Sequence, residues 1–374
     1  MENRNSLKGK LRNGAGNSLH LGTYWNIPVK VHWSFTLLLL FVIYTAYSLG
    51  LKLSQSVGFI AYIMLLFLCV ILHEYGHALT ARRFGVVTRD IIISPIGGVA
   101  RLESIPDHPK HEFLIAAAGP LVNIVIGGIL TILLALFSSR ILPEVNYYRF
   151  DDPIEFVRYI AAMNLALFIF NLIPAFPMDG GRILRSLLAA KLGKVKATKI
   201  ASGIGRVLAI GFVIFGIFNQ QLILAFIGLF IFMMAGQEYT QTKMSSILSN
   251  TKVRDIMRTT FTKLHLSDSY TTVLEKYYRE GELNFLVFDS MGNLSGTIPE
   301  LFIKDSIKNK TTDKAVMQMM SSRIAEVSPE DSIKNVIETM KLDGVAIVAV
   351  VENGQLCGVL DRHQIENHIR LKSE

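Results

Sequence analysis

Long apolar stretches fill much of the first 240 residues, and they constrain the fold more than any other feature. A helix needs about 20 apolar residues to cross a hydrocarbon core of about 30 Å. The 374 residues are 51% hydrophobic and only 18% charged, too apolar for a soluble protein of this length. We expect an α-helical polytopic membrane domain with about six transmembrane helices. The expected spans are Trp33 to Gly50, Val57 to Ala81, Phe113 to Phe137, Phe156 to Ile173, Ile204 to Phe218 and Leu222 to Tyr239.

Basic residues gather on one side of this six-span arrangement. Lys and Arg near the ends of spans favour the cytoplasmic side of a membrane. They precede span one, and they lie between spans two and three and between spans four and five: Lys8, Lys10, Arg12, Lys30, Arg82, Arg83, Arg89, Arg101, Lys110, Arg182, Arg185, Lys191, Lys194, Lys196 and Lys199. We therefore expect cytoplasmic N- and C-termini. This topology also explains the formal net charge of +8, so we expect no nucleic acid partner.

The residues after the last span form a repeat of two copies, each about sixty residues long. Each copy reads as an amphipathic helix, a β-branched strand, a turn and a second strand, which predicts a soluble α/β pair. The matching segments are Val253 to Met257 with Ala315 to Met320, Phe285 to Phe288 with Ile347 to Val350, and Gly296 to Ile298 with Gly358 to Leu360. The expected domains are a cytoplasmic N-terminal segment (1–29), the membrane domain (30–240), a linker (241–252), the first copy (253–310) and the second copy (311–374).

A histidine pair lies near the end of the second span. His73 and His77 are four residues apart, hence on one helical face, and Glu74 lies beside them. This spacing lets two imidazoles bind one zinc ion while the carboxylate reaches its water. Ionisable residues inside a span cost about 2.5–3.5 kcal/mol each and need a compensating reason. The alternative interpretation is that they are hydrogen-bonded in the bundle without metal.

A catalytic zinc site needs a third protein ligand. Asp179 is the best candidate, because it follows the fourth span and the topology places it at the depth and side of His77. On its own, an aspartate before two glycines is more often a turn residue. Gly119-Pro120 within the third span indicates a kink or close helix packing, and we assign it no chemistry.

Four segments carry a family resemblance: HEYGHALTARRFGV, IGGVARLE, AAGPLVN and NLIPAFPMDGGR. They resemble the motifs of the site-2 protease family of intramembrane zinc metalloproteases, over most of residues 30 to 240. The resemblance implies six transmembrane helices in a prokaryotic cell membrane. It also implies one zinc ion held by His73, His77 and Asp179, with Glu74 as general base. The expected reaction is hydrolysis of a peptide bond in or near a transmembrane segment of a membrane-tethered substrate.

Two further parts of these motifs are candidate site elements. Asn123 and Asn171 match family positions, where they would orient the site or stabilise an oxyanion. Interhelical hydrogen bonding is an equally good interpretation of both. Ser94 to Glu103, with the paired Gly97 and Gly98, predicts a strand or hairpin that holds an extended substrate. A purely structural hairpin is the alternative.

The C-terminal repeat resembles a pair of CBS domains, which in related membrane proteins bind adenosine nucleotides and regulate the attached unit. Family nucleotide sites have a Ser or Thr after the Gly-apolar-apolar strand and an Asp three residues later. The copies here read Gly296 to Phe302 (GTIPELF) and Gly358 to Gln364 (GVLDRHQ), and neither keeps both polar residues. An adenosine nucleotide site, a homodimer contact and substrate docking therefore stay open.

Two other functional classes fit parts of the sequence. A CBS-regulated transporter or channel would have the same C-terminal pair, but transporters tend to show inverted repeats that these spans lack. An inactive homologue would bind substrate without cutting it, and the complete set of His73, Glu74, His77 and Asp179 argues against it.

Overall fold

The computed structural model describes residues 18–95, 97–102, 108–138, 140–143, 149–309 and 315–373. The chain divides into two compact units, Met1–Tyr239 and Thr240–Glu374. Within the described residues, 5 helices are long and apolar enough to cross a membrane, which agrees with a polytopic helical domain. They are α3 (Leu53–Arg83), α4 (Pro109–Phe137), α5 (Pro153–Asn171), α7 (Lys194–Phe218) and α8 (Leu222–Asn250).

The first apolar helix is shorter than the expected first span, Trp33 to Gly50. Helix α2 (Phe35–Ser48) has 14 residues, because strand β2 continues to His32 and the chain turns at Gly50, where φ is +65°. At 1.5 Å per residue the helix is about 21 Å long, less than the thickness of the hydrocarbon core. Where about six transmembrane helices were expected, the described residues thus form five long apolar helices and one shorter apolar helix, α2.

Two further helix bounds differ from the expected spans. Helix α7 begins at Lys194, well before Ile204, and a short amphipathic helix, α6 (Asp179–Leu192), precedes it. Helix α8 continues to Asn250, so the expected linker of residues 241–252 is largely helical.

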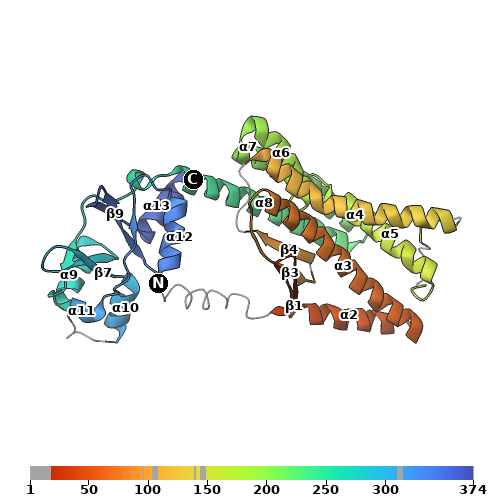
Figure 1. Ribbon diagram of the computed structural model, residues 1–374, viewed down its shortest axis with the longest axis horizontal. Coiled ribbons are helices and arrows are strands. Elements are labelled where there is room, and N and C mark those ends of the chain that lie inside the picture. Colours follow the sequence, from red (N-terminus) through yellow and green to blue (C-terminus); the bar gives the residue numbers. More distant parts are fainter. Residues whose placement is uncertain are drawn as a thin grey trace. The chain divides into compact units, whose positions relative to one another are not determined.

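Helix α4 is central to the first unit and contacts α3, α5 and α6 (Figure 1). Glycines mark its crossings: a Cβ at Gly76 of α3 would lie 2.7 Å from the Ala118 carbonyl oxygen, and one at Gly127 would lie 3.1 Å from Leu165 of α5. Small residues at such crossings let two helix backbones approach closely inside a membrane.

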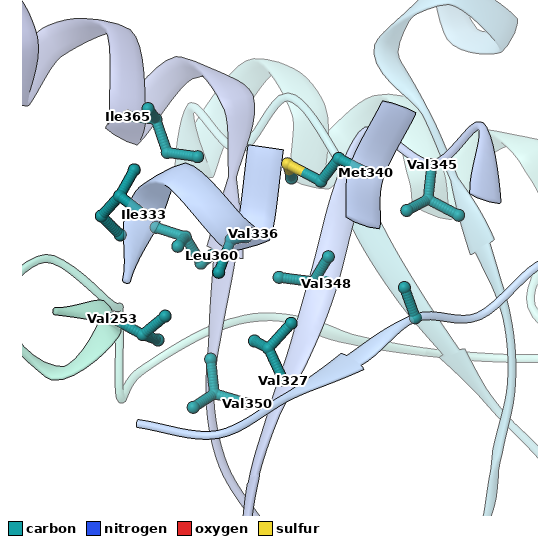
Figure 2. Close-up of a cluster of buried hydrophobic side chains, with 11 residues drawn as sticks. Val253, Val327, Ile333, Val336, Met340, Val345, Val348, Val350, Leu360 and Ile365 are labelled. Carbon is teal, nitrogen blue, oxygen red and sulfur yellow. The ribbon is translucent and has the colours of Figure 1, made fainter. Parts of the chain in front are cut away.

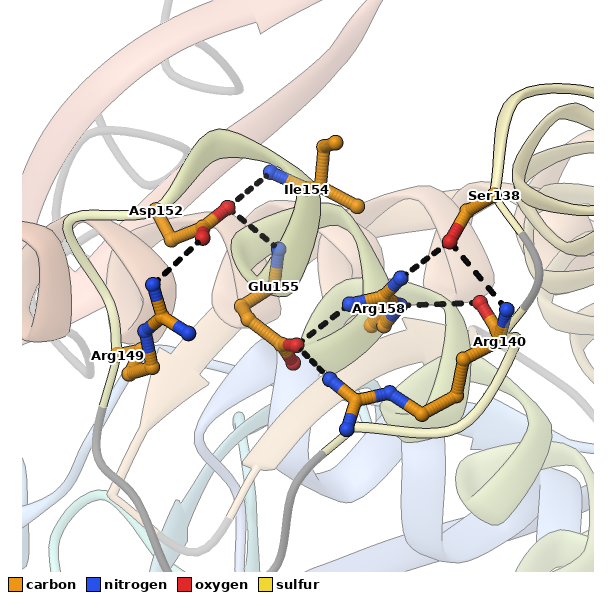
Figure 3. A network of polar contacts seen from close by, with 7 residues as sticks. All are labelled: Ser138, Arg140, Arg149, Asp152, Ile154, Glu155 and Arg158. Carbon is orange, nitrogen blue, oxygen red and sulfur yellow. Dashed lines mark hydrogen bonds and ion pairs between the residues drawn. The ribbon is translucent and has the colours of Figure 1, made fainter.

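A polar network joins the end of α4 to the start of α5 (Figure 3). The buried Glu155 carboxylate accepts hydrogen bonds from Arg140 and Arg158, and Arg158 also donates to Ser138. Asp152 caps α5 by accepting from the Ile154 and Glu155 backbone N–H groups at 2.9 and 3.2 Å. This end of the α4–α5 pair is therefore fixed by charge as well as by packing.

A four-stranded sheet packs against α3 in the order β1 (Ser18–Tyr24), β2 (Ile27–His32), β3 (Thr88–Ser94) and β4 (Gly97–Leu102). Strands β2 and β3 are parallel, and the other pairs are antiparallel. The β3–β4 hairpin contains the strand segment expected from Ser94 onward, while Glu103 lies outside the described residues. The β1–β2 hairpin was not expected from the sequence.

Apolar side chains hold the sheet to α3. Ile27, Val29, Ile91 and Ile93 form one buried cluster with residues of α3, among them Tyr75. The Tyr75 hydroxyl donates to the Ile27 and Tyr24 carbonyl oxygens, at 3.2 and 3.3 Å. The sheet is therefore docked on the segment of α3 that carries the histidine pair.

The second unit consists of two copies of one module, as predicted. The sheets have the same order, β5-β6-β7 and β8-β9-β10, with a parallel pair followed by an antiparallel pair in each. The elements are η2 (Val253–Asp255), β5 (Lys263–His265), α9 (Tyr270–Glu280), β6 (Phe285–Phe288), β7 (Leu294–Ile298), α10 (Glu300–Lys308), α11 (Val316–Met319), β8 (Glu326–Val327), α12 (Ile333–Asp343), β9 (Ile347–Glu352), β10 (Gln355–Asp361) and α13 (Arg362–Ser373).

The two copies exchange the segments that lead into their first strands. Arg258, before β5, pairs with Val359 of β10, and Ser321, before β8, pairs with Thr297 of β7. Figure 2 shows the core of the second copy, which also includes a residue from before β5, Val253. Each copy therefore supplies a backbone segment that pairs with a strand of the other copy.

Candidate metal centre

Three potential metal ligands converge where α3 meets the start of α6. The His73 and His77 Nε2 atoms are 3.1 Å apart, and the Asp179 Oδ2 atom lies 3.2 Å from the first and 3.1 Å from the second. All three residues are buried, with exposures of 7%, 6% and 7%. Two imidazole nitrogens and one carboxylate oxygen thus form a nearly equilateral triangle that could hold a metal ion.

The donor set and its spacing fit zinc. Tetrahedral zinc with bonds of about 2.0–2.1 Å separates its ligand atoms by about 3.3 Å, close to the triangle observed. The His77 Nδ1 atom lies 2.7 Å from the Ile115 carbonyl oxygen, which places the proton on Nδ1 and leaves the Nε2 lone pair for a metal. His73 Nδ1 is buried, with no hydrogen-bond partner among the described residues.

The Asp179 carboxylate is positioned by the loop before α6. Asp179 is the first residue of the helix, and the two glycines after it lie directly against the loop. A Cβ at Gly181 would be 2.7 Å from the Phe176 backbone nitrogen, and one at Gly180 would collide with the Ile173 carbonyl oxygen. The glycine pair is therefore needed for close packing, which brings Asp179 to the histidines.

Glu74 is held by the sheet. Its Oε2 atom accepts a hydrogen bond from the Ala100 backbone N–H of β4, at 2.9 Å. A Cβ at Gly98, also in β4, would lie 2.9 Å from the Glu74 Cγ atom. Strand β4 therefore lies against the Glu74 side chain and restricts its orientation.

The remaining candidates differ in their surroundings. Asn123 of α4 is 1% exposed, and neither its Oδ1 nor its Nδ2 atom has a partner among the described residues. The Asn171 Nδ2 atom donates to the Leu167 carbonyl oxygen of its own helix, at 2.9 Å. Gly97 has a φ of +132° and would have open space around a Cβ. Asn123 thus has a free amide inside the bundle, whereas the Asn171 amide has a local partner.

Sequence reasoning missed several residues that shape this centre. Some act through backbone atoms, as Ile115 and Ala100 do, and Gly119 acts through the lack of a side chain. Their residue types therefore did not indicate a role in the centre. It also missed a buried ion-pair network in which Arg185 of α6 contacts Glu112 of α4 and Glu238 of α8. Oppositely charged residues in apolar helices were the available signal for that network.

In the second copy, the two positions that match the family's nucleotide-binding residues are Asp361 and Gln364, and their side chains cap the start of α13. The Asp361 Oδ1 atom accepts from the Gln364 backbone N–H at 2.9 Å, and the Asp361 N–H donates to Gln364 Oε1 at 3.0 Å. Asp361 Oδ2 also pairs with Arg258 Nη2 at 3.2 Å. In the first copy, Pro299 precedes α10 as its N-cap residue.

Comparison with known proteins identifies the family of this chain. The family model described as Peptidase family M50 matches residues 61–152 and 143–213, and the CBS domain model matches residues 316–370. A zinc metalloprotease of Methanocaldococcus jannaschii is 34% identical over 349 residues, which is 93% of this chain and 95% of that protein. The chain belongs to peptidase family M50.

Other similar proteins include Rip3 of Mycobacterium tuberculosis, 26% identical over 93% of this chain and 94% of its own length. The solved site-2 protease of Methanocaldococcus jannaschii is 37% identical, covers 59% of this chain and 95% of its own, and has a TM-score of 0.45. As an M50 peptidase with membrane-capable helices, the chain is a site-2-type membrane metalloprotease with a CBS pair. These matches do not favour a transporter or channel.

Proposed function

We propose that this M50 peptidase binds one zinc ion per chain through His73, His77 and Asp179 and cleaves membrane-tethered proteins. The observation that carries the proposal is the triangle of two Nε2 atoms and one Oδ2 atom with sides of 3.1–3.2 Å. Zinc, when bound there, would polarise the scissile carbonyl and lower the pKa of water toward about 7.

Glu74 is the proposed general base. Its carboxylate would take a proton from the attacking water and pass it to the leaving amine nitrogen. The hydrogen bond from the Ala100 N–H holds one carboxylate oxygen, which leaves the other for proton transfer. Asn123 is the better of the two proposed amide candidates for orienting the site or the oxyanion, because its amide atoms have no protein partner among the described residues.

The proposed substrate path runs along β4. This strand is at the end of the four-stranded sheet, and an extended peptide can add to such an edge through backbone hydrogen bonds. A substrate helix must unwind first, because its own hydrogen bonds shield the peptide bond. Since Ala100 of β4 contacts Glu74, a strand added there would have its backbone beside the proposed base.

We place the centre near the cytoplasmic face of a prokaryotic cell membrane, with both termini cytoplasmic. This orientation is supported by the Lys and Arg residues of the segments that flank the motifs, because such residues favour the cytoplasmic side of a membrane. For the CBS pair we propose homodimer formation or substrate docking in preference to adenosine nucleotide binding, since Asp361 is already occupied by Gln364 and Arg258.

One experiment tests the assignment. The purified protein, Glu74→Gln and Asp179→Asn are compared for zinc per chain and for cleavage of a model transmembrane substrate. We expect wild type to bind one zinc and cleave, Glu74→Gln to keep zinc but lose at least about 100-fold in rate, and Asp179→Asn to lose both. Glu330→Gln, at an exposed glutamate of the second unit, is the matched control. Equal cleavage by wild type and Glu74→Gln, or wild type without zinc, would refute the proposal.

A further inference from the structure

Gly119 of α4 faces the two histidines of the candidate centre. A Cβ at this position would lie 2.7 Å from His73 Nε2 and would collide with the His77 Nε2 and Cε1 atoms. Real Cβ atoms do not approach other atoms this closely, so a side chain at residue 119 requires a ring to move. The atoms in its way include both nitrogens that we assign to zinc.

The His77 ring has little freedom to make that movement. Its Nδ1 atom is held by the Ile115 carbonyl oxygen, at 2.7 Å, one helical turn before Gly119. Helix α4 therefore orients the His77 ring through the Ile115 carbonyl oxygen and leaves room for its Nε2 atom at Gly119. A rotation of the ring away from residue 119 would lengthen this hydrogen bond.

Helices α3 and α4 also pack tightly at the level of the histidines. At Gly76, beside His77, a Cβ would lie 2.7 Å from the Ala118 carbonyl oxygen and 2.9 Å from a Val122 methyl group. The α3 and α4 backbones are thus in close contact at the level of the histidines. Close-packed helices transmit strain instead of absorbing it.

We propose that Gly119 is a positioning residue that reserves the space in which His73 and His77 present their Nε2 atoms to the metal. The inference rests on the proposed zinc site and deepens it. It gives the glycine of the AAGPLVN segment a role beyond helix packing. Even a methyl group there would shift the imidazole nitrogens out of the triangle with Asp179.

The test compares Gly119→Ala with Gly128→Ala, a change on the same helix where a Cβ would meet nothing within 4 Å. Zinc affinity is measured by competition with a chelator, and Co²⁺ substitution reports the ligand geometry through its visible absorption. We expect Gly119→Ala to weaken zinc binding by about 10–100-fold and to change the Co²⁺ spectrum, as loss of a metal-orienting group does. Gly128→Ala should match wild type in both measurements.

A second comparison separates a local clash from general misfolding. In a His73→Ala/His77→Ala background the rings are gone, so adding Gly119→Ala should not lower the melting temperature, whereas it should do so in wild type. Equal zinc affinity and Co²⁺ spectra in Gly119→Ala and wild type would overturn the inference. A lower melting temperature that persists without the rings would also overturn it. Wild type without zinc would instead refute the proposed function.

Discussion

The Ala100 backbone N–H donates to the Glu74 carboxylate at 2.9 Å, so the sheet and the candidate catalytic helix meet at the proposed general base. Strand β4 therefore orients the proposed base and also provides the sheet edge at which we place the substrate. Changes in β4 should therefore affect turnover without removing any potential ligand of the metal.

Gly98→Val should separate positioning of the base from metal binding. The new side chain would displace the Glu74 Cγ and Val70 Cγ1 atoms, which lie 2.9 and 3.0 Å from the position of a Cβ. Because misplacing a catalytic group by about 1 Å can cost about 100-fold, we expect a loss of that size in kcat with zinc content unchanged. Gly203→Ala, in open space on α7, is the control. Loss of zinc from Gly98→Val would contradict this prediction.

Asp90→Asn should destabilise the sheet in a pH-dependent manner. Burial raises the pKa of the Asp90 carboxyl, but hydrogen bonds from Arg101 and Lys30 outweigh it and hold the pKa below its usual range. The carboxylate therefore contributes stability above about pH 4, and this contribution is lost as the pH falls through the lowered pKa. We expect Asp90→Asn to cost about 1–3 kcal/mol at pH 7.

Thermal unfolding in detergent at several pH values checks this expectation. The difference in melting temperature between wild type and Asp90→Asn should be largest at neutral pH and should shrink below about pH 4. A difference that stays constant down to pH 3 would show that the ion pairs of Asp90 are not its source.

Arg185→Met should destabilise the first unit much more than Arg149→Met does. The Arg185 side chain is 1% exposed, and its guanidinium contacts Glu112 and Glu238 at 2.5 Å each. Removing it leaves a buried glutamate unpaired, at a cost of about 3–5 kcal/mol, or roughly 6–20 °C in melting temperature. Arg149→Met removes an exposed pair with Asp152 and should cost less than about 1 kcal/mol. Equal melting temperatures for the two variants would disprove this ranking.

Adenosine nucleotides should not bind the CBS pair of the full-length protein. Both Asp361 carboxylate oxygens already accept hydrogen bonds, from the Gln364 N–H and the Arg258 guanidinium. Calorimetric titration with AMP and ATP should give only heat of dilution. Saturable heat with either nucleotide that disappears in Asp361→Ala would reverse this expectation.

The sequence predicted features that depend on local pattern. The spacing of His73 and His77, the repeat after residue 253 and the approach of Asp179 to the histidine pair could all be predicted from the sequence alone. Backbone contacts could not: the Ala100 N–H, the Ile115 carbonyl oxygen and the space beside Gly119 depend on how elements pack. The length of α2 was overestimated because the expected span includes Trp33, Ser34, Leu49 and Gly50, which the structure places in turns.

The exchange of lead-in segments between the CBS copies has a consequence for how this part of the chain unfolds. Each copy depends on a backbone pairing supplied by the other, Arg258 with Val359 and Ser321 with Thr297. Separating the two copies would therefore remove a backbone pairing from the sheet of each, and we expect each copy to be less stable alone than in the pair. The pair should melt in a single cooperative transition, and a stop codon before Ser321, which removes both Ser321 and Val359, should destabilise the first copy as well.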